Sequence, residues 1–188
     1  YFNGEMMRNL ENDIDHVLIS AERLQERAQE LAREIERDTA VYDDLLLICV
    51  LKGGYIFLSD LSRALKRPHV VDFMGVSSYG AGTESSGVVQ IVMDLKQSIT
   101  NRHVLIVEDI IDSGRTLQYM RGLLMARKPA SLRICSLLSK PSRREVDVQV
   151  DYVGFEIPDE FVIGYGLDFD QLYRNLPYIG VLKPELFS

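Results

Sequence analysis

The feature that most constrains the fold is a set of apolar runs in which hydrophobic residues do not alternate with polar ones. Each run is bounded by turn residues. Strands of this kind are buried on both faces, which is typical of a mainly parallel sheet covered by helices. The runs span residues 45–51, 70–76, 88–93, 103–111 and 132–138.

Segments with helical character precede or separate these runs, over residues 20–37, 54–66 and 115–127. In the first segment, apolar residues recur at i, i+4, i+7 and i+11, and charged residues occupy the opposite face. This pattern predicts a surface helix that covers a sheet. A coiled coil is less favoured because the stripe lasts only about two heptads. The alternation of strands and helices predicts an α/β fold with an open, mainly parallel sheet flanked by helices.

The chain has 188 residues, which fits one domain. We expect residues 1–188 to form a single domain, with its core at about 40–140. A smaller part should come from about 1–20 and 141–188, and prolines interrupt the short apolar stretches of the second of these segments. The Gly- and Ser-rich segment 77–87 should be a loop, and loops of that length are usually functional. We assign no function to the first six residues.

The charge balance excludes one class of partner. There are 21 Lys and Arg residues against 28 Asp and Glu, a net charge of −7, which argues against nucleic-acid binding through a broad basic face. The longest apolar run, Leu45–Leu51, is far shorter than the roughly 20 residues of a membrane helix. We therefore expect neither a nucleic-acid partner nor a membrane partner.

The two cysteines, Cys49 and Cys135, lie inside apolar runs and should be buried structural thiols. The three histidines are scattered, so no zinc-binding spacing exists. The chain shows no secretory signal pattern, and we expect a cytoplasmic location.

The strongest local signal for chemistry is the segment VLIVEDIIDSGRT, residues 104–116. A buried strand there ends in two adjacent acids, Glu108 and Asp109, and a short turn then leads into a helix. Ligands of open α/β sheets bind outside the carboxyl ends of the strands. A turn rich in Ser, Gly and Thr at a helix N-terminus presents free N–H groups to a phosphate, and Gly114 permits close approach.

A simpler interpretation is an ordinary helix N-cap by Asp112 or Ser113. That interpretation leaves the paired acids of the buried strand unexplained, since unpaired buried carboxylates are costly. The chain contains no P-loop, and the Gly-Ala-Gly of residues 80–82 does not lead from a strand into a helix as a dinucleotide-binding motif would. A response-regulator receiver is disfavoured because too few residues follow Asp109.

Several motifs together resemble the hypoxanthine/guanine phosphoribosyltransferase family, bacterial branch, of the type I phosphoribosyltransferases. The resemblance covers about residues 14–185. It implies the type I fold with a small purine-binding hood, and a Mg²⁺-dependent purine salvage reaction. The 5-phosphoribosyl group would pass from PRPP to N9 of hypoxanthine, and of guanine, giving IMP or GMP and pyrophosphate. The motifs are LKGG (51–54), VSSYG (76–80), DSGRT (112–116), LLSKP (137–141) and the segment 153–184.

The resemblance also implies roles for the acidic strand end and the turn after it. Glu108 and Asp109 would bind the ribose hydroxyls, because carboxylates accept strong hydrogen bonds. Asp112 would act as the general base near N7 of the purine. The specific part of Arg115 is left open. The expected 5′-phosphate cradle comprises Asp112, Ser113, Gly114, Arg115 and Thr116.

On the purine side, the resemblance implies that Lys140 donates to the 6-oxygen and that Phe161 stacks on the base. Val162 would contact the purine edge through its backbone, Ile110 would pack on the ring, and Asp168 would also contribute to the purine site. Without the resemblance, Lys140 would be interpreted as a solvated strand-end lysine, and the apolar residues as core.

Pyrophosphate would be handled by Lys52, the backbone of Gly53 and Gly54, and Arg174, with the Leu51–Lys52 bond as a cis peptide. Ser78 and Tyr79 would belong to a lid that excludes water. The residues implied as ligands of Mg²⁺ are Glu108, Asp109 and Asp168.

The expected partners are PRPP, a 6-oxopurine, the nucleoside monophosphate and pyrophosphate, and the resemblance implies a homodimer or homotetramer. The main alternative is a PRPP-binding regulator, which needs a basic patch or an added nucleic-acid-binding module. The nearest alternative enzymes are xanthine-preferring and pyrimidine-type transferases. The preference among hypoxanthine, guanine and xanthine stays open.

Overall fold

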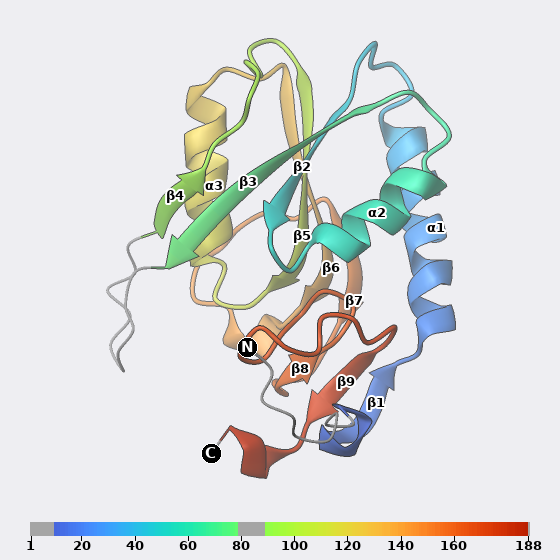
Figure 1. Cartoon of the computed structure of the whole chain (residues 1–188). Coiled ribbons are helices and arrows are strands. Elements are labelled where there is room, and N and C mark those ends of the chain that lie inside the picture. Colours follow the sequence, from blue (N-terminus) through green and yellow to red (C-terminus); the bar gives the residue numbers. More distant parts are fainter. Residues whose placement is uncertain (1–9, 79–88, 188) are drawn as a thin grey trace.

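The computed structural model describes residues 10–78 and 89–187, which form a six-stranded sheet, a small three-stranded sheet and flanking helices (Figure 1). The large sheet has the order β4-β3-β2-β5-β6-β7. All neighbours in it are parallel except β4, which pairs antiparallel with β3 at one edge. The predicted open, mainly parallel α/β fold is confirmed. The strands are β2 (Leu46–Leu51), β3 (Val70–Ser78), β4 (Val89–Met93), β5 (His103–Ile111), β6 (Ser131–Ser139) and β7 (Tyr152–Glu156).

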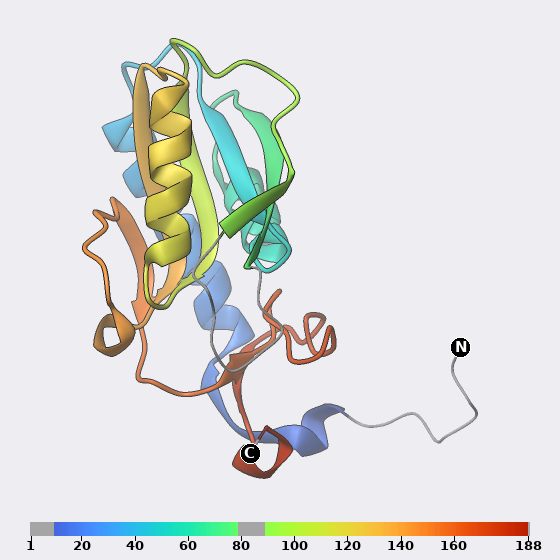
Figure 2. The ribbon, with the colours of Figure 1, turned by 90° about the vertical axis from the view of Figure 1, so that its left-hand side faces the viewer.

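Helices cover both faces of the large sheet. Helices α1 (Ala21–Asp38) and α2 (Tyr55–Ala64) lie on one face and α3 (Arg115–Ala126) on the other (Figures 1 and 2). Alternate residues of β2 therefore enter two different cores: Leu47 packs on the side of α1 and α2, and Ile48 on the side of α3. This two-sided burial explains why the strand sequences show no polar alternation.

The small sheet joins two distant parts of the chain. Strand β1 (Ile14–Ile19) pairs antiparallel with β9 (Ile179–Leu182), which pairs with β8 (Val162–Ile163). Short 3-10 helices lie at Leu10–Asp13, Pro141–Arg143 and Pro184–Leu186. One predicted boundary needs correction: β7 adds to the large sheet beyond residue 140, because it pairs with β6 and is tied to α1. The Arg27 guanidinium donates to the carbonyls of Val153 and Gly154 at 2.8 and 2.9 Å.

Several local features agree with the sequence predictions. The Leu51–Lys52 peptide bond is cis. Cys49 and Cys135 are buried and unbridged, which confirms them as buried structural thiols. Ser78 is the last residue of β3, and Tyr79 lies outside the described residues. Within residues 10–78 and 89–187, no helix combines the length and apolar character needed to cross a membrane.

Candidate active site

The candidate site lies at the carboxyl ends of three neighbouring parallel strands, β2, β5 and β6. Lys52 follows β2, Asp112 follows β5 and Lys140 follows β6. Residues from three motifs that are far apart in the sequence therefore meet at one edge of the sheet, where open α/β sheets bind their ligands.

The acid pair lies near the end of β5. Glu108 is 8% exposed, and burial, followed by the neighbouring Asp109, raises the pKa of its carboxyl well above the ordinary value. Asp109 Oδ1 accepts a hydrogen bond from the Ile110 N–H at 2.8 Å. Asp109 Oδ2 lies so close to Gly53 that a Cβ on residue 53 would be 1.4 Å from it. The absence of a side chain at residue 53 is thus what makes room for this carboxylate.

A recess of about 150 Å³ follows the acid pair at the N-terminus of α3. Helix α3 begins after Gly114, whose φ of +85° is left-handed, and no side chain of the described residues caps it. The Ser113 hydroxyl accepts from the Arg115 N–H at 3.4 Å. The helix start therefore leaves N–H groups for an anion. The recess is lined by Glu108, Ile110, Ile111, Asp112, Ser113, Gly114, Thr116 and Leu117.

The segment after β6 packs on this turn. The Ser113 carbonyl accepts from the N–H groups of Glu145 and Val146 at 3.0 and 3.2 Å. The guanidinium of Arg115 contacts the Glu145 carboxylate at 2.5 Å and does not line the recess. The side chain of Arg115 thus pairs with a neighbouring loop.

A larger cavity of about 650 Å³ lies on the other side of Asp112. Lys140, 8% exposed, and the half-exposed Phe161 both line it. The Lys140 Nζ lies 3.6 Å from Asp159 Oδ1. Arg143 bridges two carboxylates, with Nε 3.1 Å from Asp112 Oδ1 and Nη1 3.5 Å from Asp159 Oδ2.

Three residues predicted for the purine, Ile110, Val162 and Asp168, do not line this cavity. Asp168 pairs with Arg174. Val162 is buried in β8 and packs in the core on the side of α1 and α2. Ile110 lines the smaller recess. Phe161 itself stacks on Phe187, with ring centroids 4.8 Å apart, and meets Phe169 edge-on at 5.6 Å.

The residues predicted for pyrophosphate gather on a third side of the site. Arg174 Nη1 donates to the Gly166 carbonyl at 2.8 Å, and Nη2 lies 2.8 Å from Asp168 Oδ1. Lys52 Nζ donates to Gln171 Oε1 at 3.0 Å. The loop that carries Asp168 and Arg174 thus reaches the residue that follows β2.

Known proteins match this chain over nearly its whole length. The phosphoribosyl transferase domain family matches residues 20–170. A hypoxanthine-guanine phosphoribosyltransferase of Mycobacterium avium is 53% identical over 181 residues, which are 94% of this chain and 89% of that protein. The chain belongs to the hypoxanthine-guanine phosphoribosyltransferase family.

Other matches agree with this family. A crystal structure of a hypoxanthine phosphoribosyltransferase from Staphylococcus aureus has a TM-score of 0.91 and 49% identity, covering 98% of this chain and all of that one. A bifunctional protein TilS/HprT of Listeria innocua is 52% identical over 182 residues, 96% of this chain. The chain spans only 28% of the length of that bifunctional protein.

Three residues of this phosphoribosyltransferase site were not predicted from the sequence: Arg143, Asp159 and Gln171. Arg143 and Asp159 line the larger cavity, and Gln171 contacts Lys52. All three lie within or beside segments that carry the family resemblance. That position is the signal that could have found them, because no local pattern distinguishes them from surface residues.

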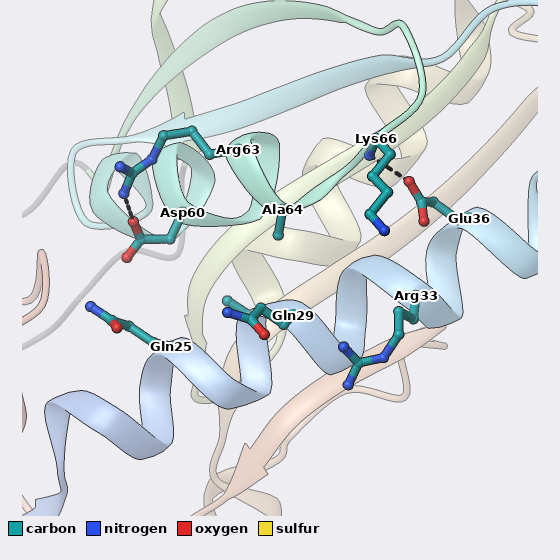
Figure 3. A pocket seen from close by; sticks show the side chains of 9 residues that line it. Gln25, Gln29, Arg33, Glu36, Asp60, Arg63, Ala64 and Lys66 are labelled. Atoms are coloured by element: carbon teal, nitrogen blue, oxygen red, sulfur yellow. Dashed lines mark hydrogen bonds and ion pairs between the residues drawn. The ribbon is translucent and has the colours of Figure 1, made fainter.

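A further groove, of about 500 Å³, lies between α1 and α2 and contains none of the predicted site residues (Figure 3). Two contacts lie within the groove: the Arg63 guanidinium pairs with the Asp60 carboxylate, and the backbone N–H of Lys66 donates to the Glu36 carboxylate. We assign it no part in phosphoribosyl transfer.

Proposed function

We propose that this chain transfers the 5-phosphoribosyl group from PRPP to N9 of hypoxanthine, and of guanine, forming IMP or GMP and releasing pyrophosphate. The observation that carries the proposal is the position of Asp112, which lines both the larger cavity and the recess at α3. A base in the cavity and a phosphate in the recess would then lie on either side of one carboxylate.

In the proposed reaction, the bond from ribose C1′ to pyrophosphate breaks as N9 of the purine bonds to C1′. Glu108 and Asp109 hold the ribose hydroxyls, and the N–H groups at the start of α3, with the hydroxyls of Ser113 and Thr116, hold the 5′-phosphate. Lys52 and Arg174, with the backbone of Gly53 and Gly54, take up the charge of the leaving pyrophosphate.

Lys140 gives the proposed preference for 6-oxopurines. An ammonium group has donors and no acceptor, so it pairs with a 6-oxygen and not with the 6-amino group of adenine. Asp112 takes or shares the purine proton at N7, and Phe161 stacks on the ring. Arg143 contacts Oδ1 of Asp112 in this structure, which leaves Oδ2 of the same carboxylate for the purine proton.

The donor set fits Mg²⁺ that is shared with substrate. The buried Glu108 beside Asp109 offers hard oxygen ligands whose mutual repulsion a cation relieves, and Asp168 offers another carboxylate across the site. The described residues contain no group of three or more His, Cys, Asp or Glu that could hold a metal by itself. Mg²⁺ commonly binds through one or two carboxylates plus substrate phosphates and water. It would supply neutralisation of the pyrophosphate charge.

The remaining parts of the proposal concern the lid and the assembly. We propose that Ser78 and Tyr79 belong to a lid that excludes water and so keeps the cationic ribose from hydrolysis, although Tyr79 lies outside the described residues. We also propose a homodimer or homotetramer in the cytoplasm.

A panel of hypoxanthine, guanine, xanthine and adenine with PRPP and Mg²⁺ tests the function. We expect nucleotide and pyrophosphate from hypoxanthine and guanine and none from adenine. The rate with xanthine then gives the order of preference among the three 6-oxopurines. A purified protein that releases no pyrophosphate with either of the first two bases would overturn the proposal.

A further inference from the structure

The side-chain amide of Gln171 lies between two cations that come from distant parts of the chain. Its Oε1 accepts from Lys52 Nζ at 3.0 Å and from Arg174 Nη2 at 3.3 Å. Both cations can only donate, so the carbonyl oxygen of the amide is the atom that must face them.

The two cations are held to different degrees. Arg174 is also anchored by the Gly166 carbonyl and the Asp168 carboxylate, both at 2.8 Å. Across the described ranges, Lys52 has no side-chain hydrogen bond or ion pair other than the one to Gln171. Gln171 therefore ties an otherwise unrestrained lysine to an anchored arginine.

An amide is suited to this position because it carries no charge. Two cations near one another repel, and an acceptor between them offsets part of that repulsion. A carboxylate would also cancel most of their positive charge, whereas an amide leaves it available to an anion. The ammonium of Lys52 uses one of its three donors on Gln171, and two stay available.

The backbone conformation of Gln171 is a second indication that its side chain has a role. Its φ of +66° is left-handed, which is uncommon for a residue with a side chain, and its N–H donates to Asp168 Oδ2 at 2.8 Å. A glycine would adopt this conformation without strain. Glutamine at this position indicates that the side chain contributes something the backbone does not need.

We propose that Gln171 is a positioning residue, which holds Lys52 and Arg174 at the spacing that receives the pyrophosphate group of PRPP. The inference rests on the proposed function, since it assigns the two cations to that group. It predicts that loss of the Gln171 side chain weakens the binding of PRPP and of pyrophosphate and leaves the binding of the purine unchanged.

Three substitutions separate the side chain from the backbone: Gln171→Ala, Gln171→Gly and Gln171→Glu. We expect each to raise the KM for PRPP by about tenfold, the size of one lost hydrogen bond to a charged group, with kcat and the KM for hypoxanthine changed less than about twofold. Gln171→Gly should do so even though it relieves backbone strain. Gln171→Glu should bind PRPP at least as weakly as Gln171→Ala, although it can keep both contacts, because its charge competes with pyrophosphate.

Gln25→Glu is the matched control, since it makes the same charge change at an exposed position of α1, in the groove toward α2, and should leave both KM values unchanged. An unchanged KM for PRPP in the three variants would overturn the inference. An equal loss toward both substrates would also overturn it, since that pattern indicates damage to the fold. Absence of activity in the unmodified protein would reject the proposed function instead.

Discussion

The carboxylate of Asp109 occupies the space that a side chain on Gly53 would need: Oδ2 would lie 1.4 Å from a Cβ there. The far side of the same glycine is also filled, because its carbonyl oxygen would lie 2.1 Å from a Cβ on Gly166. Three segments that carry proposed ribose, pyrophosphate and metal residues are therefore packed through two glycines.

Gly53→Ala tests this packing. The added methyl group must displace the Asp109 carboxylate, so we expect kcat/KM to fall about a hundredfold or more, as misplacement of a reacting group by about 1 Å does. Steady-state kinetics with PRPP and hypoxanthine measure it. Gly122→Ala is the matched control, because a Cβ in that helical position meets nothing within 4 Å. It should stabilise the protein by about 0.5–1 kcal/mol and leave activity intact. Normal activity of Gly53→Ala would contradict the packing argument.

In the absence of substrates and Mg²⁺, Glu108→Gln should stabilise the protein against unfolding. The same substitution should remove most of the enzymatic activity. Burial and the neighbouring Asp109 raise the pKa of Glu108 above its usual 4.5, so the folded protein keeps this proton to a higher pH than the unfolded chain. The stability of the unmodified protein thus falls as the pH rises above that usual value, and glutamine removes this loss.

Thermal unfolding of both proteins in EDTA from about pH 4 to pH 8 measures the difference. The advantage of Glu108→Gln should be small at the acidic end and should widen with increasing pH, because only the unmodified protein must ionise a buried acid. A difference that is constant over this range would indicate that the ionisation of Glu108 contributes nothing.

Lys140→Gln should weaken the discrimination between oxopurines and aminopurines. An amide can present either a donor or an acceptor to position 6, whereas the ammonium presents only donors. We expect kcat/KM for hypoxanthine to fall about a hundredfold and its ratio to that for adenine to shrink. Lys96→Gln, at an exposed surface position, is the control and should change neither value. If the ratio of kcat/KM for hypoxanthine to that for adenine stays unchanged, Lys140 does not recognise the group at position 6 of the purine.

The two thiols should be inert toward alkylating agents in the folded protein. Burial, with a smaller effect from Glu108 and Asp109, raises the pKa of Cys49 to about 12, and burial also raises the pKa of Cys135. Iodoacetamide at about pH 8 should therefore add no mass to the native protein and two adducts after unfolding, as read by mass spectrometry. Labelling of either thiol in the native state would show that the core opens there.

The large sheet was predictable because two-sided burial imposes continuous apolar runs. Strand β7 was not, since its five residues, YVGFE, contain a glycine and a glutamate and form no such run. The pairing of β1 with β9 joins opposite ends of the chain, and no local pattern reports a contact at that separation.

The site shows the same division. The turn at residues 112–116 has a local phosphate-binding signature, so it could be derived from the residues themselves. Lys140 could be proposed only through the family resemblance. Arg143, Asp159 and Gln171 act through contacts across loops, and those contacts depend on how the loops fold rather than on any spacing along the chain.

The carbonyl of Ser113, which accepts from two successive N–H groups at Glu145 and Val146, ties the loop that follows Lys140 to the start of α3. That loop is exposed at several positions, so by its surface location it would look suitable for inserting a tag or an epitope. The separation between Lys140 and the turn at α3 is set by the sheet, because the Lys140 N–H donates to the Ile111 carbonyl at 2.9 Å. Inserted residues would instead pull the loop away from the Ser113 carbonyl, whereas the turn between α3 and β6, residues 127–130, lies at the opposite ends of these elements.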